Sequence, residues 1–209
     1  MHLVPKARRI AAPLALVLAL FALAAGSAHA SLLVADGANC NDYSSSQVFL
    51  PWADPANYTL APGGDFEKGS SRWNLVGASR VGNDNESFQV GGSADRASLS
   101  LPSGSVAISP AMCVGLSHPD FRVFFKQTDG SAVAALRIDV LFDDATGTTQ
   151  TQNVGGVGGR SSWTLSAQIP IVVNLLPLLD QGTPVAFRFT ALGGDFRIDD
   201  LYVDPWTRG

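Results

Sequence analysis

The chain has 209 residues, enough for one domain of ordinary size or two small ones. Apolar residues make up 46% of the sequence and charged residues 15%, which allows a buried core and excludes a coiled coil, a helical bundle rich in Glu and Lys, and a disordered chain. Acidic residues exceed basic ones by 18 to 14.

Residues 1–30 have the pattern of a secretory signal peptide. The basic start is formed by Lys6, Arg8 and Arg9. An apolar run at 14–25 follows, and the small residues Ala28 and Ala30 precede the expected cleavage position. The run is shorter than the roughly 20 residues that cross a bilayer, and no later run of the sequence reaches that length. We therefore expect a secreted, extracellular chain that begins near Ser31 and has no membrane span in its mature part.

The expected mature chain is acidic and contains two cysteines. Removing residues 1–30 takes three of the 14 basic residues and none of the 18 acidic ones, which leaves a net charge of −7. With Lys68 and Lys126 as its only lysines, such a chain is a poor match for a phosphate backbone, so we predict no nucleic-acid partner. An even cysteine count in an oxidising compartment predicts a disulfide between Cys40 and Cys113. Two free buried thiols are the alternative.

Short runs rich in Val, Phe, Leu and Ile, separated by Gly, Pro, Asp and Ser clusters, predict many strands and almost no helix. In chain order, the expected strands cover 47–50, 73–79, 87–90, 97–101, 106–108, 121–127, 133–142, 147–154, 162–169, 185–191 and 196–203. This regular spacing is typical of a β-sandwich or barrel. No linker or repeat divides the chain, so we expect a single domain over 31–209, with 31–61 as an N-terminal extension.

Alternation along three expected strands defines a polar outer face. In 133–142 the apolar residues at even positions share one face, whereas Arg137 and Asp139 point the other way. If 121–127 and 185–191 are neighbouring strands, the face also carries polar and aromatic side chains from both. The candidate ligand-binding residues on it are Arg122, Phe124, Arg137, Asp139 and Arg188. The face is either solvated, with cross-strand ion pairs, or a recognition surface on which Arg and Asp bind hydroxyls and an aromatic ring supplies a platform.

Few residues could form a catalytic centre. His2 and His29 leave with the signal peptide, so His118 is the one histidine of the mature chain, which excludes a zinc site with two or three histidines. No G-x-S-x-G motif supplies a nucleophile. The glutamates are Glu67 and Glu86, and most aspartates lie in turn-like sequence, so no pair for glycoside hydrolysis is evident. We expect a protein that is not an enzyme.

The four tryptophans fall into two groups. Trp73 and Trp163 lie within expected strands, where burial is the usual environment of a tryptophan. Trp52 and Trp206 lie in loop-like sequence near the two ends of the domain. Each of these two is either an exposed platform for a ligand or a lid packed over the edge of the sandwich.

Three stretches carry a family resemblance. They are Phe66-Glu67-Lys68-Gly69 followed by Trp73, the strand Ser162-Trp163-Thr164-Leu165, and the closing run Phe196-Arg197-Ile198-Asp199-Asp200-Leu201-Tyr202-Val203. Over roughly residues 62–205 the chain resembles galactose-binding-like jelly-roll domains, the fold of many carbohydrate-binding modules attached to xylanases and glucanases. The whole chain, including Val48-Phe49-Leu50-Pro51-Trp52, also resembles a group of small secreted bacterial proteins, which implies export but no particular ligand.

The jelly-roll resemblance also implies a metal site. In that family a glutamate of the opening strand and an aspartate of the closing strand often ligate a structural calcium, and these positions are Glu67 and Asp199 here. The residues add a hint of their own, because the apolar alternation changes phase between Ile198 and Leu201. A β-bulge at 199–200 could therefore aim a carboxylate inward. A strand end with solvated aspartates is the alternative.

Together these observations predict an all-β, single β-sandwich of the galactose-binding-like jelly-roll type. The leading functional hypothesis is a secreted, non-catalytic binding module for extracellular carbohydrate, stabilised by calcium and without an organic cofactor. The alternative is a surface or matrix protein that binds another protein, or itself, through an exposed apolar patch.

Overall fold

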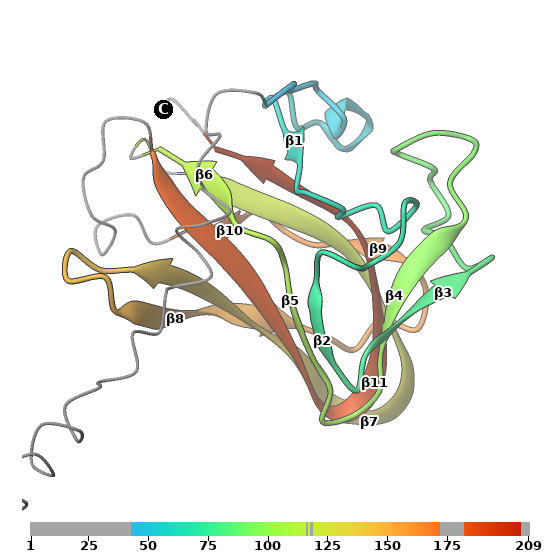
Figure 1. Cartoon of the computed structure of the whole chain (residues 1–209). Coiled ribbons are helices and arrows are strands. Elements are labelled where there is room, and N and C mark those ends of the chain that lie inside the picture. Colours follow the sequence, from blue (N-terminus) through green and yellow to red (C-terminus); the bar gives the residue numbers. More distant parts are fainter. Residues whose placement is uncertain (1–42, 116, 118, 172–181, 206–209) are drawn as a thin grey trace, which may run out of the picture. The chain divides into compact units, whose positions relative to one another are not determined.

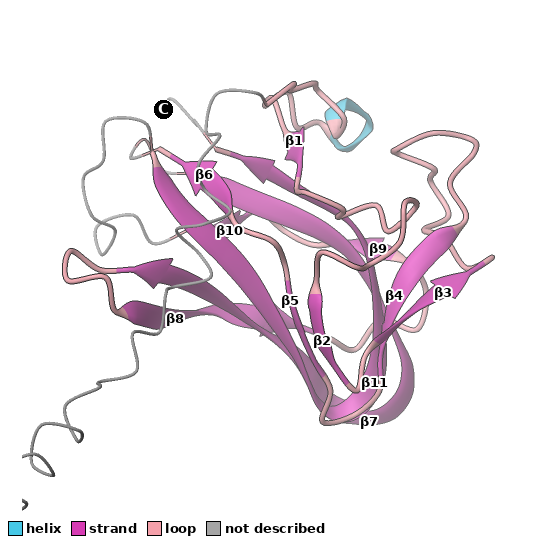
Figure 2. Cartoon of the chain, in the orientation of Figure 1, coloured by secondary structure: helices cyan, strands magenta, loops and turns pink. Residues whose placement is uncertain are grey.

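The computed structural model describes residues 43–115, 117, 119–171 and 182–205, all of which belong to the unit Ser31–Gly209. These residues form strands and loops, with one short 3-10 helix, η1, at Leu50–Trp52 (Figure 2). Within this part of the chain, no helix is long and apolar enough to cross a membrane. The expected signal peptide, Cys40, His118 and Trp206 lie outside the described residues.

Two long antiparallel strands organise the fold. Strand β7 spans Asp120–Asp143 and β11 spans Thr183–Asp204, and they pair along nearly their whole length. The paired ribbon bends where its register is interrupted, near Gly130 and Gly194 (Figure 1). Gly130 has a φ of 110°, and a Cβ there would lie 2.5 Å from the Gly194 Cα. A glycine is therefore required for the two backbones to approach at the bend.

The bend folds the sheet into two layers (Figure 1). The shorter strands are β1 (Thr59–Leu60), β2 (Asn74–Val76), β3 (Ser79–Gly82), β4 (Ala97–Leu101), β5 (Val106–Ile108), β6 (Met112–Val114), β8 (Thr149–Val157), β9 (Thr164–Leu165) and β10 (Ile169–Pro170). In one layer, β8 pairs with the second half of β7, and β5 and β6 pair with the first half of β11. In the other, β9 and β10 pair with the first half of β7, and β1 and β4 pair with the second half of β11. The prediction of an all-β sandwich is confirmed.

The main core lies between the two layers. It contains the inward side chains of β4, β7 and β11, among them Leu99, Leu101, Phe121, Val123, Leu136, Ile138, Val140, Phe187, Phe189, Phe196 and Ile198. Each such side chain contributes about 1.5–3 kcal/mol through burial. Trp73 is buried as expected, and its indole N–H donates to the Gly63 carbonyl at 3.1 Å. The opening segment before β2 is thereby fastened to the core.

A second apolar cluster lies on the outer face of the layer that contains the first half of β7. Phe49, from the N-terminal segment, is fully buried there and packs against Tyr58, Phe124 and Tyr202 at ring-centroid distances of 4.8, 6.2 and 5.6 Å. The backbones of Ser46 and Tyr58 exchange two hydrogen bonds of 2.9 Å. The N-terminal segment therefore covers a sheet face that alternation alone would leave in water.

Some expected strands differ from the observed ones. The runs 121–127 and 133–142 are halves of β7, and 185–191 and 196–203 are halves of β11, because the strands continue through the bend instead of ending in turns. The run 47–50 leads into η1 and is not a strand. The run 87–90 is a loop, because the buried Glu86 carboxylate accepts hydrogen bonds from the loop's backbone N–H groups.

Candidate functional site

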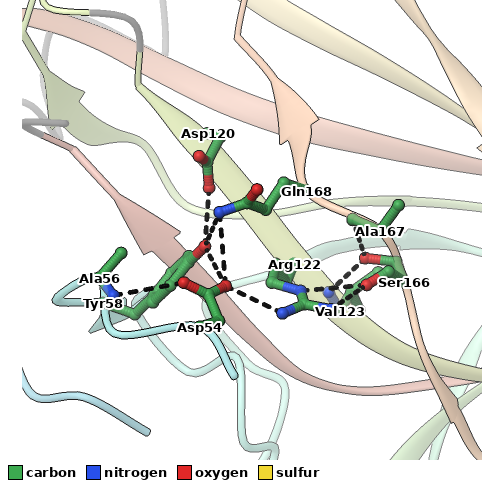
Figure 3. Close-up of polar contacts among 9 residues, drawn as sticks. All are labelled: Asp54, Ala56, Tyr58, Asp120, Arg122, Val123, Ser166, Ala167 and Gln168. Carbon is green, nitrogen blue, oxygen red and sulfur yellow. Dashed lines mark hydrogen bonds and ion pairs between the residues drawn. The ribbon is translucent and has the colours of Figure 1, made fainter. Parts of the chain in front are cut away.

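A polar network lies where the N-terminal segment meets the starts of β7 and β10 (Figure 3). Asp54 follows η1, Tyr58 precedes β1, Asp120 and Arg122 belong to β7, and Gln168 directly precedes β10. The Tyr58 hydroxyl lies 2.9 Å from Asp54 Oδ2 and 3.0 Å from Asp120 Oδ1, and the Gln168 amide donates to it at 3.2 Å. The network thus joins three segments that are far apart in sequence: 54–58, 120–122 and the residue Gln168.

Arg122 is held rigidly at one end of this network. Its Nη1 donates to Asp54 Oδ2 at 2.9 Å, while Nε and Nη2 both donate to the Ser166 carbonyl, at 3.0 and 2.8 Å. The guanidinium also lies 5.1 Å from the centroid of the Phe49 ring, a cation–π contact. Asp54 Oδ1 accepts from the Ala56 backbone N–H at 3.2 Å. Both charged groups are therefore oriented by the protein itself.

Three carboxylates crowd the buried side of the network. Burial raises the pKa of Asp120 to about 6; the Tyr58 hydroxyl and Arg122 oppose the rise, whereas the Asp204 and Asp54 carboxylates add to it. Burial also raises the pKa of Tyr58, so the phenol keeps its proton. One hydroxyl proton cannot serve two carboxylates at once. Because its pKa is about 6, the Asp120 carboxyl gains a proton on mild acidification, and it can then donate to the Tyr58 oxygen.

An open pocket of about 390 Å³ lies on the solvent side of the network. It is lined by Trp52, Ala53, Asp54, Pro55, Arg122 and Gln168. Trp52 is partly exposed and meets the Phe88 ring edge-on at 5.1 Å, and Phe88 is itself 50% exposed. The pocket therefore sets one aromatic side chain, Trp52, beside a carboxylate, a guanidinium and an amide. Such a combination is chemically suited to a ring that has an apolar face and hydroxyl groups on its rim.

Three of the predicted site residues form an ion-pair cluster in the other layer. Asp139 is 1% exposed and accepts hydrogen bonds from Arg137 at 2.9 Å, Arg188 at 3.0 Å and Asn153 at 2.9 Å. Burial alone would raise the pKa of Asp139, but these hydrogen bonds lower it. The geometry matches the cross-strand ion-pair interpretation, since Arg188 and Asp139 are register partners. A role of Arg137 and Arg188 in ligand binding stays a prediction.

The other two predicted residues lie in the pocket layer, because the bend of β7 separates them from Asp139. Arg122 lines the pocket as a candidate ligand contact. Phe124 is fully buried beneath the Phe49 and Trp52 rings, so the prediction that it forms an exposed platform is wrong. Trp52 packs over Phe124 and is partly exposed. Its loop-like surroundings in the sequence left its exposure open, and only the contacts of the extension determine it.

The β-bulge predicted near the end of the closing strand is present. The β7–β11 register shifts between Asp199 and Tyr202, and Asp200 has a φ of 49°. Asp199, however, accepts backbone hydrogen bonds of 2.9 Å from both Glu86 and Asp200. Glu67 Oε1 likewise accepts from the backbone N–H groups of 96 and 97, at 2.7 and 2.6 Å. The two predicted metal ligands are thus already engaged with the backbone.

Asp200, next to the predicted ligand, is the carboxylate that lacks partners. It is 1% exposed, and neither of its oxygens has a hydrogen-bond partner; the same holds for Asp95 Oδ2. Both side chains approach Gly91, where a Cβ would overlap Asp95 Oδ2 and lie 3.5 Å from Asp200 Oδ1. Burial and the carboxylates of Glu86 and Asp95 raise the pKa of Asp200 to about 8, and the nearby Gly91 backbone N–H only partly opposes this rise. Unpartnered buried oxygens that converge in this way fit a cation such as calcium.

The protein side chains alone would not complete a calcium site. Among the described residues, no three Asp, Glu, His or Cys side chains form a metal-binding group. Calcium takes six to eight oxygens, which commonly include backbone carbonyls and water. Asp95 and Asp200 would therefore hold only part of its coordination shell.

No protein-family model and no curated protein matches the chain. Solved structures resemble it at low identity. The C-terminal family 22 carbohydrate-binding module of Clostridium thermocellum Xyn10B is 16% identical over 66% of this chain and 88% of that one, with a TM-score of 0.44. A family 11 carbohydrate-binding module from Clostridium thermocellum, in complex with a β-1,3-1,4-mixed-linked tetrasaccharide, is 15% identical over 73% of this chain and 98% of that one, with a TM-score of 0.42. The enzymatically active domain of bacteriophage CBA120 tailspike protein 4 is 13% identical over 69% of this chain and 21% of that one, with a TM-score of 0.47.

Proposed function

We propose that this chain is a secreted, non-catalytic binding module for an extracellular carbohydrate, and that the sugar binds in the pocket beside Trp52. The observation that carries the proposal is the composition of that pocket: a partly exposed indole stands next to Asp54, Arg122 and Gln168. A sugar ring can stack on an indole through its apolar face, while its hydroxyls donate to a carboxylate and accept from guanidinium and amide N–H groups.

The pocket is organised for binding before a ligand arrives. Tyr58 and Ser166 hold the Asp54–Arg122 pair in place, so binding does not have to order these long side chains. The pocket lining includes one carboxylate, Asp54, whereas glycoside hydrolysis uses two that flank the scissile bond. Asp120 lies behind Tyr58 and is not part of the lining. These features favour binding over catalysis.

We also propose that calcium and a disulfide stabilise the module. Asp200 and Asp95 would bind the cation directly, and Asp199 and Glu67 would position the surrounding backbone. Calcium supplies positive charge to a cluster of buried carboxylates. Cys113 is fully buried, and its backbone N–H donates to the Tyr43 hydroxyl at 2.8 Å. A bond from Cys113 to Cys40 would fasten the N-terminal segment in the same region.

A glycan panel tests the proposed function. The purified chain is incubated with soluble and insoluble polysaccharides in calcium-containing buffer, and the bound fraction is measured. We expect retention on one glycan class and a loss of about 2 kcal/mol of binding free energy, about 30-fold, in Trp52→Ala. Leu50→Ala is the matched control, because Leu50 lies in the same η1 turn and is 55% exposed. Binding to no glycan, or equal binding by both variants, would contradict the proposal.

One observation favours the alternative function, a protein-interaction surface. Val133 is 91% exposed and Leu192 is 46% exposed, and both lie at the bend of the β7–β11 ribbon. Exposed apolar side chains of this kind can mediate association between proteins. Analytical ultracentrifugation of the wild type and Val133→Asp distinguishes the two functions. Association that increases with concentration and is lost in the variant, without glycan binding, would favour the alternative.

A further inference from the structure

The outer face of β7 continues from the pocket to a second group of polar side chains. Arg122, Phe124 and Lys126 occupy alternate positions of β7 and therefore lie on one face. Arg122 lines the pocket, and Phe124 lies beneath Trp52 with ring centroids 5.7 Å apart. Lys126 is four residues from Arg122, about 13 Å farther along the strand at roughly 3.3 Å per residue. A ligand longer than one sugar ring could reach it.

Two cations share one carboxylate at this far end. Lys126 Nζ donates to Asp84 Oδ1 at 2.7 Å, and Arg197, the cross-strand partner of Lys126, forms an ion pair with Asp84 Oδ2. Lys126 Nζ also lies 4.8 Å from the centroid of the Trp163 ring. The group formed by Lys126, Arg197, Asp84 and Trp163 has a formal charge of +1, and we call it the cationic group.

The cationic group has more hydrogen-bond donors than acceptors. Arg197 Nε and Trp163 Nε1 are buried without a partner. The Lys126 ammonium has three N–H donors, one of which serves Asp84. The Lys126 and Arg197 side chains keep 17% and 23% of their surface exposed. Burial lowers the pKa of Lys126, so a nearby anion would stabilise its charged form. The missing partner is a group that accepts hydrogen bonds and carries negative charge.

We propose that Lys126 and Arg197 bind a carboxylate of the ligand, and that the ligand is therefore an acidic polysaccharide containing uronic acid. The inference rests on the proposed function, because it requires one sugar in the pocket beside Trp52. Trp52 and the half-exposed Phe88, which pack over the buried Phe124, provide an apolar surface between the two polar ends. The expected mature chain has a net charge of −7, so attraction to a polyanion has to come from a local cationic site.

The test compares matched pairs of polysaccharides at low salt and constant calcium. Polygalacturonate, alginate and glucuronoxylan are each measured beside their carboxyl-reduced, neutral forms. We expect about tenfold tighter binding of one acidic form than of its reduced counterpart. Lys126→Gln should remove this preference and leave binding of the neutral form unchanged, which also shows that the variant is folded. Arg72→Gln, the same charge change at an exposed loop position, is the control and should keep the preference.

The outcomes separate the inference from the proposed function. Equal binding of acidic and neutral forms, or a Lys126→Gln variant that behaves like Arg72→Gln, would overturn the carboxylate contact and leave the pocket standing. Binding of neither form across all pairs would overturn both. If Lys126→Gln fails to fold, Asp84→Asn replaces it. Removing the competing carboxylate should strengthen binding of the acidic form, and unchanged or weaker binding would count against the inference.

Discussion

Replacing Asp200 with asparagine should make the protein more stable without calcium and less stable with it. The Asp200 carboxyl is 1% exposed and unpartnered, and its pKa is raised from 3.8 to about 8. A raised pKa means that the folded state resists ionisation, so stability present below pH 3.8 is lost as the pH rises toward 8. At pH 7 this loss amounts to about 4 kcal/mol, at about 1.4 kcal/mol per pKa unit.

Asparagine removes the charge but introduces an amide that also lacks partners, which costs about 2 kcal/mol. In EDTA, Asp200→Asn should therefore have a free energy of unfolding about 2 kcal/mol higher than the wild type at pH 7. Calcium reverses the order, because a ligand at a hundredfold excess over its Kd adds about 2.7 kcal/mol to a protein that binds it. The wild type gains this stabilisation, and the variant, which lacks the charged ligand, gains much less.

Urea unfolding in EDTA and in millimolar calcium measures the free energy of unfolding of the wild type and of Asp200→Asn under both conditions. Asp195→Asn is the matched control, because Asp195 is a partly exposed β11 carboxylate that accepts from the Ser103 N–H at 2.8 Å, a bond that an asparagine oxygen can keep. The control should follow the wild type in both buffers. A wild type that is equally stable in both, together with an Asp200→Asn variant that is less stable in EDTA, would refute the reasoning, since the carboxylate would then be satisfied by the protein itself.

Three further perturbations test other parts of the structure. The folded pKa of Asp120 is about 6 instead of 3.8, so the free energy of unfolding of the wild type should fall by at most about 3 kcal/mol between pH 4 and pH 7. Thermal melts of Asp120→Asn should show a flatter dependence of stability on pH over this range. An unchanged slope in the variant would contradict the prediction. Gly130→Ala should lower the free energy of unfolding by at least about 2 kcal/mol, because its Cβ meets the facing backbone, whereas Gly147→Ala has open space and should lose less. If Cys40 and Cys113 are paired, reduction should lower the melting temperature of the wild type and leave Cys113→Ser unaffected.

Local patterns predicted those features that depend on neighbouring residues. Alternation along 133–142 and 185–191 identified the core face, because a buried face repeats every second residue wherever the strand runs. The phase change at 199–200 located the bulge for the same reason. The phase change does not distinguish Asp199 from Asp200, and the family resemblance points to Asp199. Both side chains are buried, and the one whose oxygens lack partners is Asp200.

Features that depend on distant contacts were harder to predict. The turn-like sequence Thr128-Asp129-Gly130 is equally compatible with a hairpin and with a bend inside one strand, so alternation alone places the outer face on one surface instead of two layers. The burial of Phe124 depends on Phe49, which is 75 residues away in the sequence. No local signal in the sequence shows that the N-terminal segment covers the outer face of the first half of β7. The sequence leaves Trp52 open as a platform or a lid. In the structure it packs on Phe49, Phe88 and Phe124 and stays partly exposed.

Because the β7–β11 ribbon runs through both layers, the pairing of one layer cannot change without changing the pairing of the other. In a sandwich whose layers are joined by loops, one sheet can slip or fray while the other keeps its pairing. Here a one-residue slip between β7 and β11 would turn the inward side chains outward on both sides of the bend at once. We therefore expect the amide protons of the two layers to exchange through a common opening reaction. A sugar or cation bound on one layer should slow exchange in the other, although it makes no contact there.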